Sequence, residues 1–163
     1  TLCALLLSVL ISSCASNDAP GGKVPSQLER RSFQTREFDT PDTRLVMKAT
    51  INVLQDMGFQ IANADADLGL LTAEKWANIE HKKKEIKKAR KEGRPLSKSI
   101  VLESTANVST YGAKQTRVRV NFLERILDDT GATMAVNQID DARFYQQFFA
   151  SVDKGVFLQQ EGV

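Results

Sequence analysis

Residues 116–127 read T-R-V-R-V-N-F-L-E-R-I-L, and this stretch decides the fold. Its apolar residues recur at every second position, the spacing that places side chains on one face of a β-strand. The apolar set is Val118, Val120, Phe122 and Ile126, and the polar set between them is Arg117, Arg119, Asn121 and Arg125. The alternation predicts a strand in an antiparallel sheet, with one face against a core and the other in water.

Further strands are predicted on both sides of this stretch. Residues 99–111 alternate in the same way, and residues 132–139 form a weaker run. Gly112 and the D-D-T-G sequence at 128–131 are typical of turns, so these three strands are expected to be antiparallel neighbours. Earlier in the chain, residues 32–39 are predicted as an edge strand, and residues 59–64 and 70–74 as a hairpin around an Asp-rich turn.

Two amphipathic helices are predicted near the ends of the folded domain. The first begins with Thr40 as the cap and Pro41 in the first turn, and it ends at Gly58. The second is capped by Asp140, and its apolar face, which includes Tyr145 and Phe148, is expected to lie across the sheet. Between them, residues 74–93 are dense in charge, with a thin apolar stripe of Trp76, Ile79 and Ile86. This segment is interpreted as a solvated helix or a helical insert in the sheet. The fold class is therefore α+β: one domain with an antiparallel sheet of five or six strands, a helix near each end and a charged helical insert.

Composition excludes several classes of protein. The chain has 163 residues, a formal charge of +2 and 42% hydrophobic residues, which suits one globular domain with a tail. A sequence pI near 8.6 falls short of the basic excess of nucleic-acid-binding proteins, so no nucleic-acid partner is expected. Two cysteines and one histidine leave little material for a metal cluster or a Cys/His catalytic pair.

The N-terminal segment indicates export. Residues 2–11 read L-C-A-L-L-L-S-V-L-I, an uncharged run with the length of a signal-peptide core and too short to span a bilayer. The next residues, Ile11-Ser12-Ser13-Cys14, resemble the lipobox of bacterial lipoproteins. The resemblance implies that Cys14 is lipidated and begins the mature chain, and that Ala15 after it favours the outer membrane. A cleaved signal without lipid, or a buried apolar helix with a chance cysteine, are the alternatives.

These features predict the organisation of the chain. Residues 1–13 are interpreted as a lipoprotein signal peptide, 14–31 as the lipid anchor and a flexible linker, and 32–163 as an α+β periplasmic domain. Residues 54–73, L-Q-D-M-G-F-Q-I-A-N-A-D-A-D-L-G-L-L-T-A, resemble BamC-like (NlpB-type) lipoprotein domains, in which a helix likewise leads into a hairpin that ends near a tryptophan. This resemblance implies a similar fold.

No catalytic or metal site is expected. Asn63, Asp65, Asp67 and Glu74 have the spacing of calcium-loop ligands, but Leu68 stands where such a loop needs glycine, so a hairpin turn is favoured. His81 lies among lysines and is interpreted as a surface residue. The Asp128–Asp129 and Asp140–Asp141 pairs suit turns and caps better than acid/base chemistry. With no phosphate-binding or nucleophile motif in the sequence, no enzyme activity and no cofactor are expected.

Residues 80–94 are strongly basic, with eight Lys or Arg against three Glu and a local charge of +5. The hypothesis is binding to an anionic surface of the envelope. It is assigned to Lys82, Lys83, Lys84, Lys87, Lys88, Arg90 and Lys91. The alternative is a helix that is simply solvated. A second stripe, Arg117, Arg119 and Arg125, either docks a protein or pairs with residues such as Glu103 on a neighbouring strand.

The functional expectation follows from location and the lack of reaction chemistry. The sequence predicts a non-catalytic lipoprotein of the outer membrane, facing the periplasm. It would act as an accessory or scaffold subunit of an envelope assembly, secretion or transport complex. Its partners would be the membrane, through the N-terminal lipid, and an envelope protein. The alternative is a stand-alone ligand-binding lipoprotein with a cavity between the sheet and the C-terminal helix.

Overall fold

The structure, a computed structural model, describes residues 24–162. The helices are α1 (Gln27–Gln34), α2 (Thr43–Asp56), α3 (Lys83–Glu92) and α4 (Ala142–Gln160). The strands are β1 (Thr35–Phe38), β2 (Gln60–Asp65), β3 (Leu70–Asn78), β4 (Ser97–Tyr111), β5 (Gln115–Asp128) and β6 (Thr133–Gln138). The predicted α+β class is confirmed: the domain has a six-stranded antiparallel sheet with helices near both ends and the charged helix α3 between strands.

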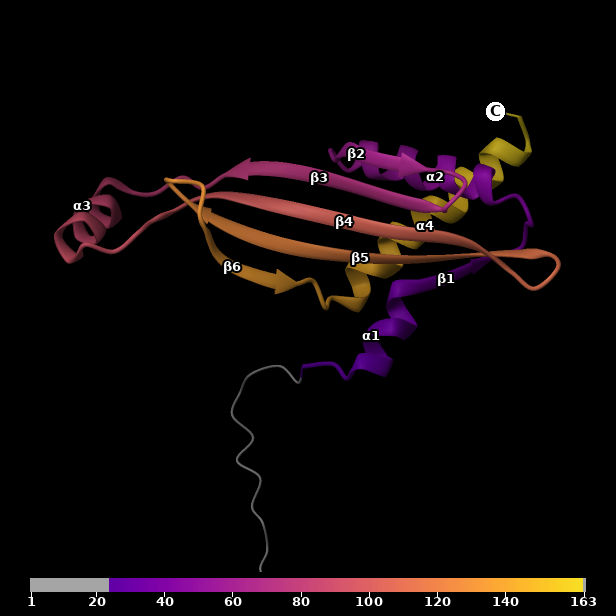
Figure 1. The fold of residues 1–163 in the computed structure, drawn as a ribbon, viewed down its shortest axis with the longest axis horizontal. Coiled ribbons are helices and arrows are strands. Elements are labelled where there is room, and N and C mark those ends of the chain that lie inside the picture. Colours follow the sequence, from indigo (N-terminus) through magenta and orange to yellow (C-terminus); the bar gives the residue numbers. More distant parts are fainter. Residues whose placement is uncertain (1–23, 163) are drawn as a thin grey trace, which may run out of the picture.

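The sheet is built around the long β4–β5 hairpin (Figure 1). Its strand order is β1-β5-β4-β3-β2, and β6 also pairs with β5. Because β4 occupies one side of β5, β1 and β6 share the other side, β1 along the first residues of β5 and β6 along the last. The alternation of β5 is as predicted: Val118, Val120 and Phe122 are fully buried, while Arg117 and Arg119 face the other way.

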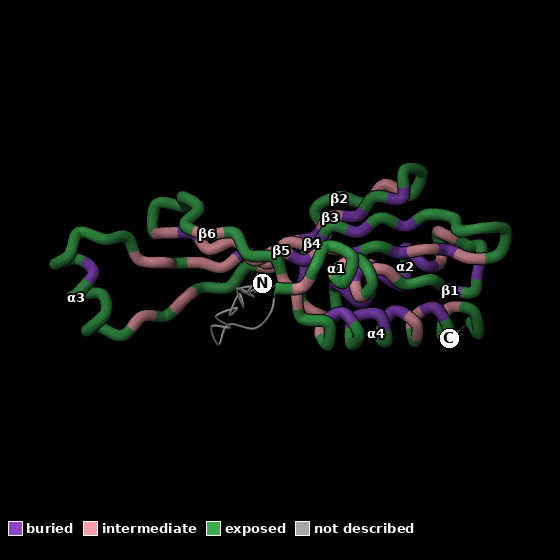
Figure 2. Tube along the Cα trace, turned by 90° about the horizontal axis from the view of Figure 1, so that it is seen from below, coloured by how far each residue is buried: buried purple, intermediate pink, exposed green. Residues whose placement is uncertain are grey.

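Helices α2 and α4 cover one face of the sheet and leave the other open (Figures 1 and 2). Phe122 of β5 lies at the centre of this core, with its ring centroid 5.6 Å from that of Tyr145 and 5.3 Å from that of Phe148. Burial of each such side chain contributes about 1.5–3 kcal/mol to folding. The packing of α4 across the sheet confirms the predicted position of this helix.

The strands extend beyond the helices as an arm that carries α3 at its tip. The arm consists of the end of β3, the start of β4, the end of β5 and β6 (Figure 1). Buried residues are gathered in the helix-covered body, and most of the arm is exposed or half-buried (Figure 2). On the arm's open face Val101 is buried, whereas its cross-strand neighbour Trp76 is 61% exposed. The sheet is therefore much longer than the part that the core stabilises.

Several local predictions are corrected by the structure. The cap of α2 is Asp42, whose Oδ1 accepts a hydrogen bond from the Leu45 amide at 2.9 Å, and Thr40 is instead buried before the helix. The cap of α4 is Asp141, because Asp140 is engaged by an arginine of α1. Trp76 lies on β3, which continues to Asn78, so the expected helical stripe of Trp76, Ile79 and Ile86 does not form.

The N-terminal predictions fall largely outside the described residues. The signal peptide at 1–13 and the lipidated Cys14 lie there, and the boundary predicted between residues 31 and 32 falls inside α1. Among residues 24–162, none of the helices combines the length and the hydropathy that crossing a bilayer requires.

Candidate binding sites

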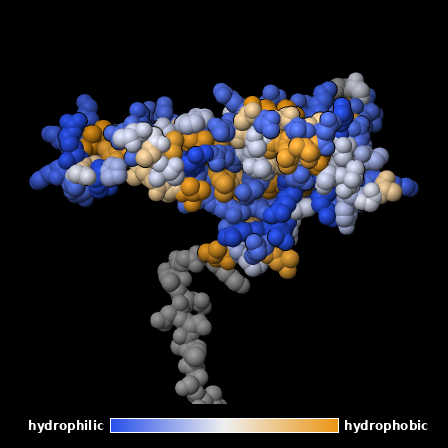
Figure 3. Space-filling model, viewed as in Figure 1, coloured by the Kyte–Doolittle hydropathy of each residue, from blue (hydrophilic) through white to orange (hydrophobic). Residues whose placement is uncertain are grey.

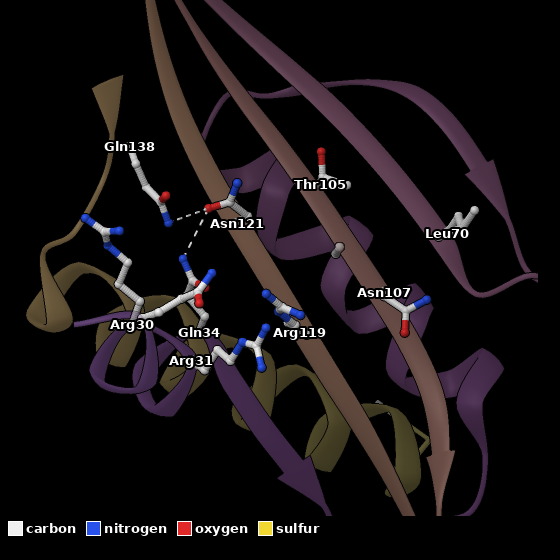
Figure 4. A pocket seen from close by; sticks show the side chains of 11 residues that line it. Arg30, Arg31, Gln34, Leu70, Thr105, Asn107, Arg119, Asn121 and Gln138 are labelled. Carbon is white, nitrogen blue, oxygen red and sulfur yellow. Dashed lines mark hydrogen bonds between the residues drawn. The ribbon is translucent and has the colours of Figure 1, made fainter. Parts of the chain in front are cut away.

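A hollow of about 430 Å³ lies between α1 and the open face of the sheet (Figure 4). We call it the arginine basin. From α1 it is lined by Gln27, Arg30, Arg31 and Gln34, and from the sheet by Leu70, Thr105, Ala106, Asn107, Arg119, Asn121 and Gln138. Three arginines and several amides line the basin, and no carboxylate is among the lining residues. The basin therefore favours an anionic or hydrogen-bonding ligand.

Helix α1 forms one wall of the basin because of its cap and its spacing. Ser26 Oγ accepts a hydrogen bond from the Glu29 amide at 3.2 Å, and Glu29 Oε2 accepts one from the Ser26 amide at 2.6 Å, a reciprocal capping box. The four lining residues of α1 are spaced i, i+3, i+4 and i+7, which places them on one face of the helix. The helix start thus fixes which residues point into the basin.

Arg30 anchors this wall to Asp140, the residue before the N-cap of α4. Its Nε and Nη2 atoms donate to Oδ1 and Oδ2 of Asp140 at 2.9 and 2.7 Å, a bidentate pair. Both side chains are about three-quarters buried, with 27% and 22% of their surface exposed. A bidentate pair in this setting is directional and stronger than an exposed ion pair. Arg30 is therefore neutralised by its structural contact.

An amide network forms the inner end of the basin. Asn121 Oδ1 accepts hydrogen bonds from Gln34 Nε2 at 3.2 Å and from Gln138 Nε2 at 3.1 Å (Figure 4). Gln34, which is 3% exposed, also donates to Tyr145 Oη at 3.4 Å, and this oxygen accepts the Phe122 amide at 3.2 Å. Burial raises the pKa of Tyr145 above its ordinary value, with the two hydrogen bonds acting in the opposite direction. The network ties the floor of the basin to the core.

Arg31 and Arg119 are the two free cations of the basin. Both side chains are exposed, and neither has a hydrogen-bond or ion-pair partner within residues 24–162. Figure 4 shows their guanidinium groups on the same side of the basin. A guanidinium presents a planar fork of donors that matches a carboxylate or phosphate. The two free forks give the basin its capacity to bind an anion.

The other arginines of the predicted stripe are paired. Arg117 donates to Glu37 Oε1 at 2.8 Å and stacks 3.5 Å above the centre of the Tyr111 ring. The hydrogen bond to Glu37 raises the pKa of Arg117. Arg125 forms an ion pair with Glu103 of β4, the cross-strand alternative considered from the sequence. Arg119 is thus the member of the stripe left for a ligand.

The basic residues predicted to bind an anionic surface lie together at the tip of the arm. Lys83, Lys84, Lys87, Lys88, Arg90 and Lys91 belong to α3, and Lys82 is its N-cap; all seven are exposed. The structure therefore places this predicted cluster far along the sheet from the arginine basin (Figure 1).

The remaining candidates have structural partners. Asp65 Oδ1 accepts the amides of Asp67 and Leu68 at 3.0 and 2.9 Å, so this carboxylate closes the hairpin turn. A hydrogen bond from the Thr130 hydroxyl, the largest of several, lowers the pKa of Asp128. His81 is half-buried before α3, with Nε2 2.5 Å from the Ser97 carbonyl oxygen. Within the described part of the chain, His, Cys, Asp and Glu residues do not gather into groups of three that a metal ion needs.

The arginine basin was missed by the sequence analysis. Its residues come from α1, β3, β4, β5 and β6, and only the sheet register brings them together. One signal was available: Ser26 followed by Glu29 is a capping-box pattern that marks the start of α1.

Comparisons with known proteins found similarity in structure but no match in sequence. No protein-family model matches the chain, and no curated protein matches it significantly in sequence. Among solved structures, the chain is similar to the crystal structure of a DUF4468 family protein from Bacteroides ovatus ATCC 8483. The TM-score is 0.36 at 10% identity, over 75% of this chain and 84% of that chain. The resemblances to a lipobox and to BamC-like domains stay predictions.

Proposed function

We propose that this chain is a lipid-anchored, non-catalytic binding protein of the bacterial envelope. In this role it is an accessory or scaffold subunit of an assembly, secretion or transport complex, and its arginine basin holds an acidic segment of a partner protein. The observation that carries the proposal is the pair of guanidinium groups of Arg31 and Arg119, which have no partner within residues 24–162 and lie in a hollow to which these residues contribute no carboxylate.

The chemistry of the basin favours a peptide carboxylate over an apolar ligand. Small-molecule pockets are lined mainly by hydrophobic and aromatic side chains. Here the lining is dominated by guanidinium and amide groups, and the hollow opens on the uncovered face of a long sheet. A charge-assisted hydrogen bond contributes about 1.5–3 kcal/mol when it is well formed. Two arginines can therefore hold one or two acidic side chains of an extended segment that crosses the sheet.

The predicted anchor supports this role by its position in the chain. Thirteen residue steps separate Cys14 from Gln27, where α1 and the wall of the basin begin. At no more than about 3.6 Å per residue, the basin would lie within roughly 50 Å of a lipidated Cys14. A partner on the periplasmic side of the outer membrane is within that reach.

The alternative function is a stand-alone lipoprotein that binds a small ligand. From the sequence, its cavity was expected between the sheet and the C-terminal helix. In the structure, the rings of Phe122, Tyr145 and Phe148 pack against one another there. The basin on the opposite face has the size of a small-molecule site. A compact dicarboxylate is therefore the ligand that this alternative would take.

The test is a titration with a fluorescent oligoglutamate peptide, followed by anisotropy. The variant is Arg31→Gln/Arg119→Gln, and the control is Lys48→Gln/Lys154→Gln, which removes the same charge from exposed positions on α2 and α4. We expect the basin variant to bind at least tenfold more weakly, since two contacts of about 1.5 kcal/mol or more are lost, and the control to bind like the parent. Equal losses in both variants would mean non-specific charge attraction. Competition by free glutarate at the peptide's own affinity would favour the small-ligand alternative.

A further inference from the structure

Helix α3 separates its charges between two faces. Glu85, Ala89 and Glu92 are spaced i, i+4 and i+7, so they share one face, and Ala89 on that face is buried. Glu85 Oε2 accepts the Lys82 amide at 3.1 Å and lies 3.6 Å from His81 Nδ1. The two acidic residues of α3 therefore face the arm, beside the buried alanine.

The second acidic residue of this face is also engaged. Glu92 accepts from Arg94 Nε at 2.9 Å and lies 3.9 Å from Lys88 Nζ. Both carboxylates of α3 thus interact with residues of the same segment. The opposite face of α3 carries neither of these two acidic residues.

The opposite face of α3 is basic around one apolar residue. Lys83, Ile86, Lys87 and Arg90 are spaced i, i+3, i+4 and i+7 and surround a shallow hollow of about 140 Å³. Ile86 is 41% exposed, and the three cations have no ion-pair partner in the part of the chain that the structure describes. Lys84 and Lys91 flank this face and are also without a partner there. We call Lys83, Ile86, Lys87 and Arg90 the basic face.

The arm places this face away from the body of the domain. Five residues of β4, Ser97 to Val101, precede Leu102, which packs against the core cluster; they span about 17 Å at 3.3 Å per residue. Helix α3 lies beyond the start of that strand (Figure 1). Figure 3, which shows the uncovered face, has hydrophobic side chains exposed among hydrophilic ones along the arm and at its tip. The exposed apolar residues of the arm strands are Trp76, Met134 and Val136.

We propose that the basic face of α3 docks on an anionic phospholipid surface, with Ile86 entering the interface and Lys83, Lys87 and Arg90 contacting headgroup phosphates. Apolar residues rimmed by Lys and Arg are the pattern of helices that lie in a bilayer interface. Nucleic acid or an acidic peptide would use the cations and would leave Ile86 without a role. The proposal rests on the proposed envelope location, and it gives the protein a second membrane contact besides the predicted lipid at Cys14.

The test is vesicle flotation with the chain that begins at residue 15, which lacks the predicted anchor and contains the whole described domain. Vesicles of phosphatidylcholine containing phosphatidylglycerol are compared with pure phosphatidylcholine. The basic-face variant is Lys83→Gln/Lys87→Gln/Arg90→Gln, and the control is Lys48→Gln/Lys114→Gln/Lys154→Gln, three exposed lysines away from α3. Far-UV circular dichroism checks that all variants are folded.

We expect the parent and the control to float with the anionic vesicles and the basic-face variant to bind at least tenfold more weakly. Ile86→Ser should weaken binding several-fold, because an apolar contact is removed while every charge is kept. Equal binding by the basic-face variant and the control, or equal flotation with pure phosphatidylcholine, overturns the proposal. Undiminished binding by Ile86→Ser overturns insertion of the isoleucine. The oligoglutamate titration of the basin is an independent measurement, so failure here and failure of the proposed function are told apart.

Discussion

Replacing Gly69 by alanine tests a close approach between two backbone segments, the turn before β3 and the strand β4. Gly69 follows the Asp-rich turn with a φ of +65°, and its carbonyl oxygen accepts the Val108 amide at 2.8 Å. A Cβ added at this position would lie 1.9 Å from the Val108 carbonyl oxygen. The substitution therefore forces β3 and β4 apart at a residue whose side chain is in the core.

The expected cost of Gly69→Ala is the sum of three effects. The left-handed backbone conformation costs a residue with a Cβ about 1–2 kcal/mol. Loss of the hydrogen bond between Gly69 and Val108 adds about 0.5–1.5 kcal/mol. Displacement of Val108 from its packing adds an amount comparable to a core substitution, about 1 kcal/mol or more. We expect the free energy of unfolding to fall by about 3–4 kcal/mol.

Gly112→Ala is the matched control. Gly112 has nearly the same φ, +61°, in the turn between β4 and β5, but no atom lies within 4 Å of its added Cβ. This variant should lose only the conformational part, about 1–2 kcal/mol. Urea unfolding of the two variants measures both losses. Equal losses would refute the argument that close approach of β3 and β4, and not φ alone, requires glycine at position 69.

Three further predictions concern α1, the core and the arm. Arg30→Gln should remove the bidentate contact with Asp140 and lower the free energy of unfolding by about 1–2 kcal/mol. Hydrogen exchange of the α1 amides should become faster, while exchange elsewhere stays the same. Unchanged exchange in α1 would contradict the anchoring role of Arg30. Tyr145→Phe leaves the Phe122 amide without its acceptor and should cost about 1–2 kcal/mol. Because burial raises the pKa of Tyr145, the unfolded chain loses the phenolic proton at a lower pH than the folded chain. The free energy of unfolding of the parent should therefore fall as the pH rises above about 10, and that of the phenylalanine variant should fall less. Parallel pH profiles of the two proteins would contradict this expectation. Trp76, the single tryptophan, is 61% exposed and should show a solvent-exposed emission maximum with full accessibility to acrylamide, whereas blue-shifted, protected emission would place it in a core.

The strands were predictable because their residues are sorted by face. Val118, Val120 and Phe122 point into the core as the alternation requires, and the paired β4 follows the same rule at Ala106 and Val108. In the arm, the helices no longer cover the sheet. There the buried residue of β4 is Val101, which lies on the face opposite to that of Ala106 and Val108. Alternation identifies the two faces of a strand, but it does not say how far along the strand a core extends.

The wrong predictions for the cap of α4 and for Trp76 both result from tertiary contacts. Asp140 and Asp141 are equally good caps by sequence, and Asp141 takes this role because Arg30, far away in the chain, binds Asp140. Trp76 was assigned to a charged helix because its neighbours are polar, whereas pairing with Val101 places it on β3. Such choices depend on contacts that are distant in sequence.

The arginine basin shows the same limit for function. Arg119 was recognised as part of an exposed stripe of arginines. The sequence did not show that Arg117 pairs with Glu37 and Arg125 with Glu103, whereas Arg119 has no such ion pair within residues 24–162. Its companion Arg31 comes from a helix that the sequence analysis assigned mostly to a linker. The basic cluster of α3, by contrast, is contiguous in sequence and could be recognised there, and its binding role stays a prediction. Its division into an acidic and a basic face needed the helix bounds.

The intact mass of the protein, purified from the membranes of the cell that makes it, tests the predicted lipid anchor. We expect a chain that begins at Cys14 and carries a diacylglyceryl group on the sulfur of that residue, recovered in the outer-membrane fraction. An unmodified polypeptide in the soluble interior of the cell would contradict it, because the proposed partner and the proposed lipid surface both belong to the envelope.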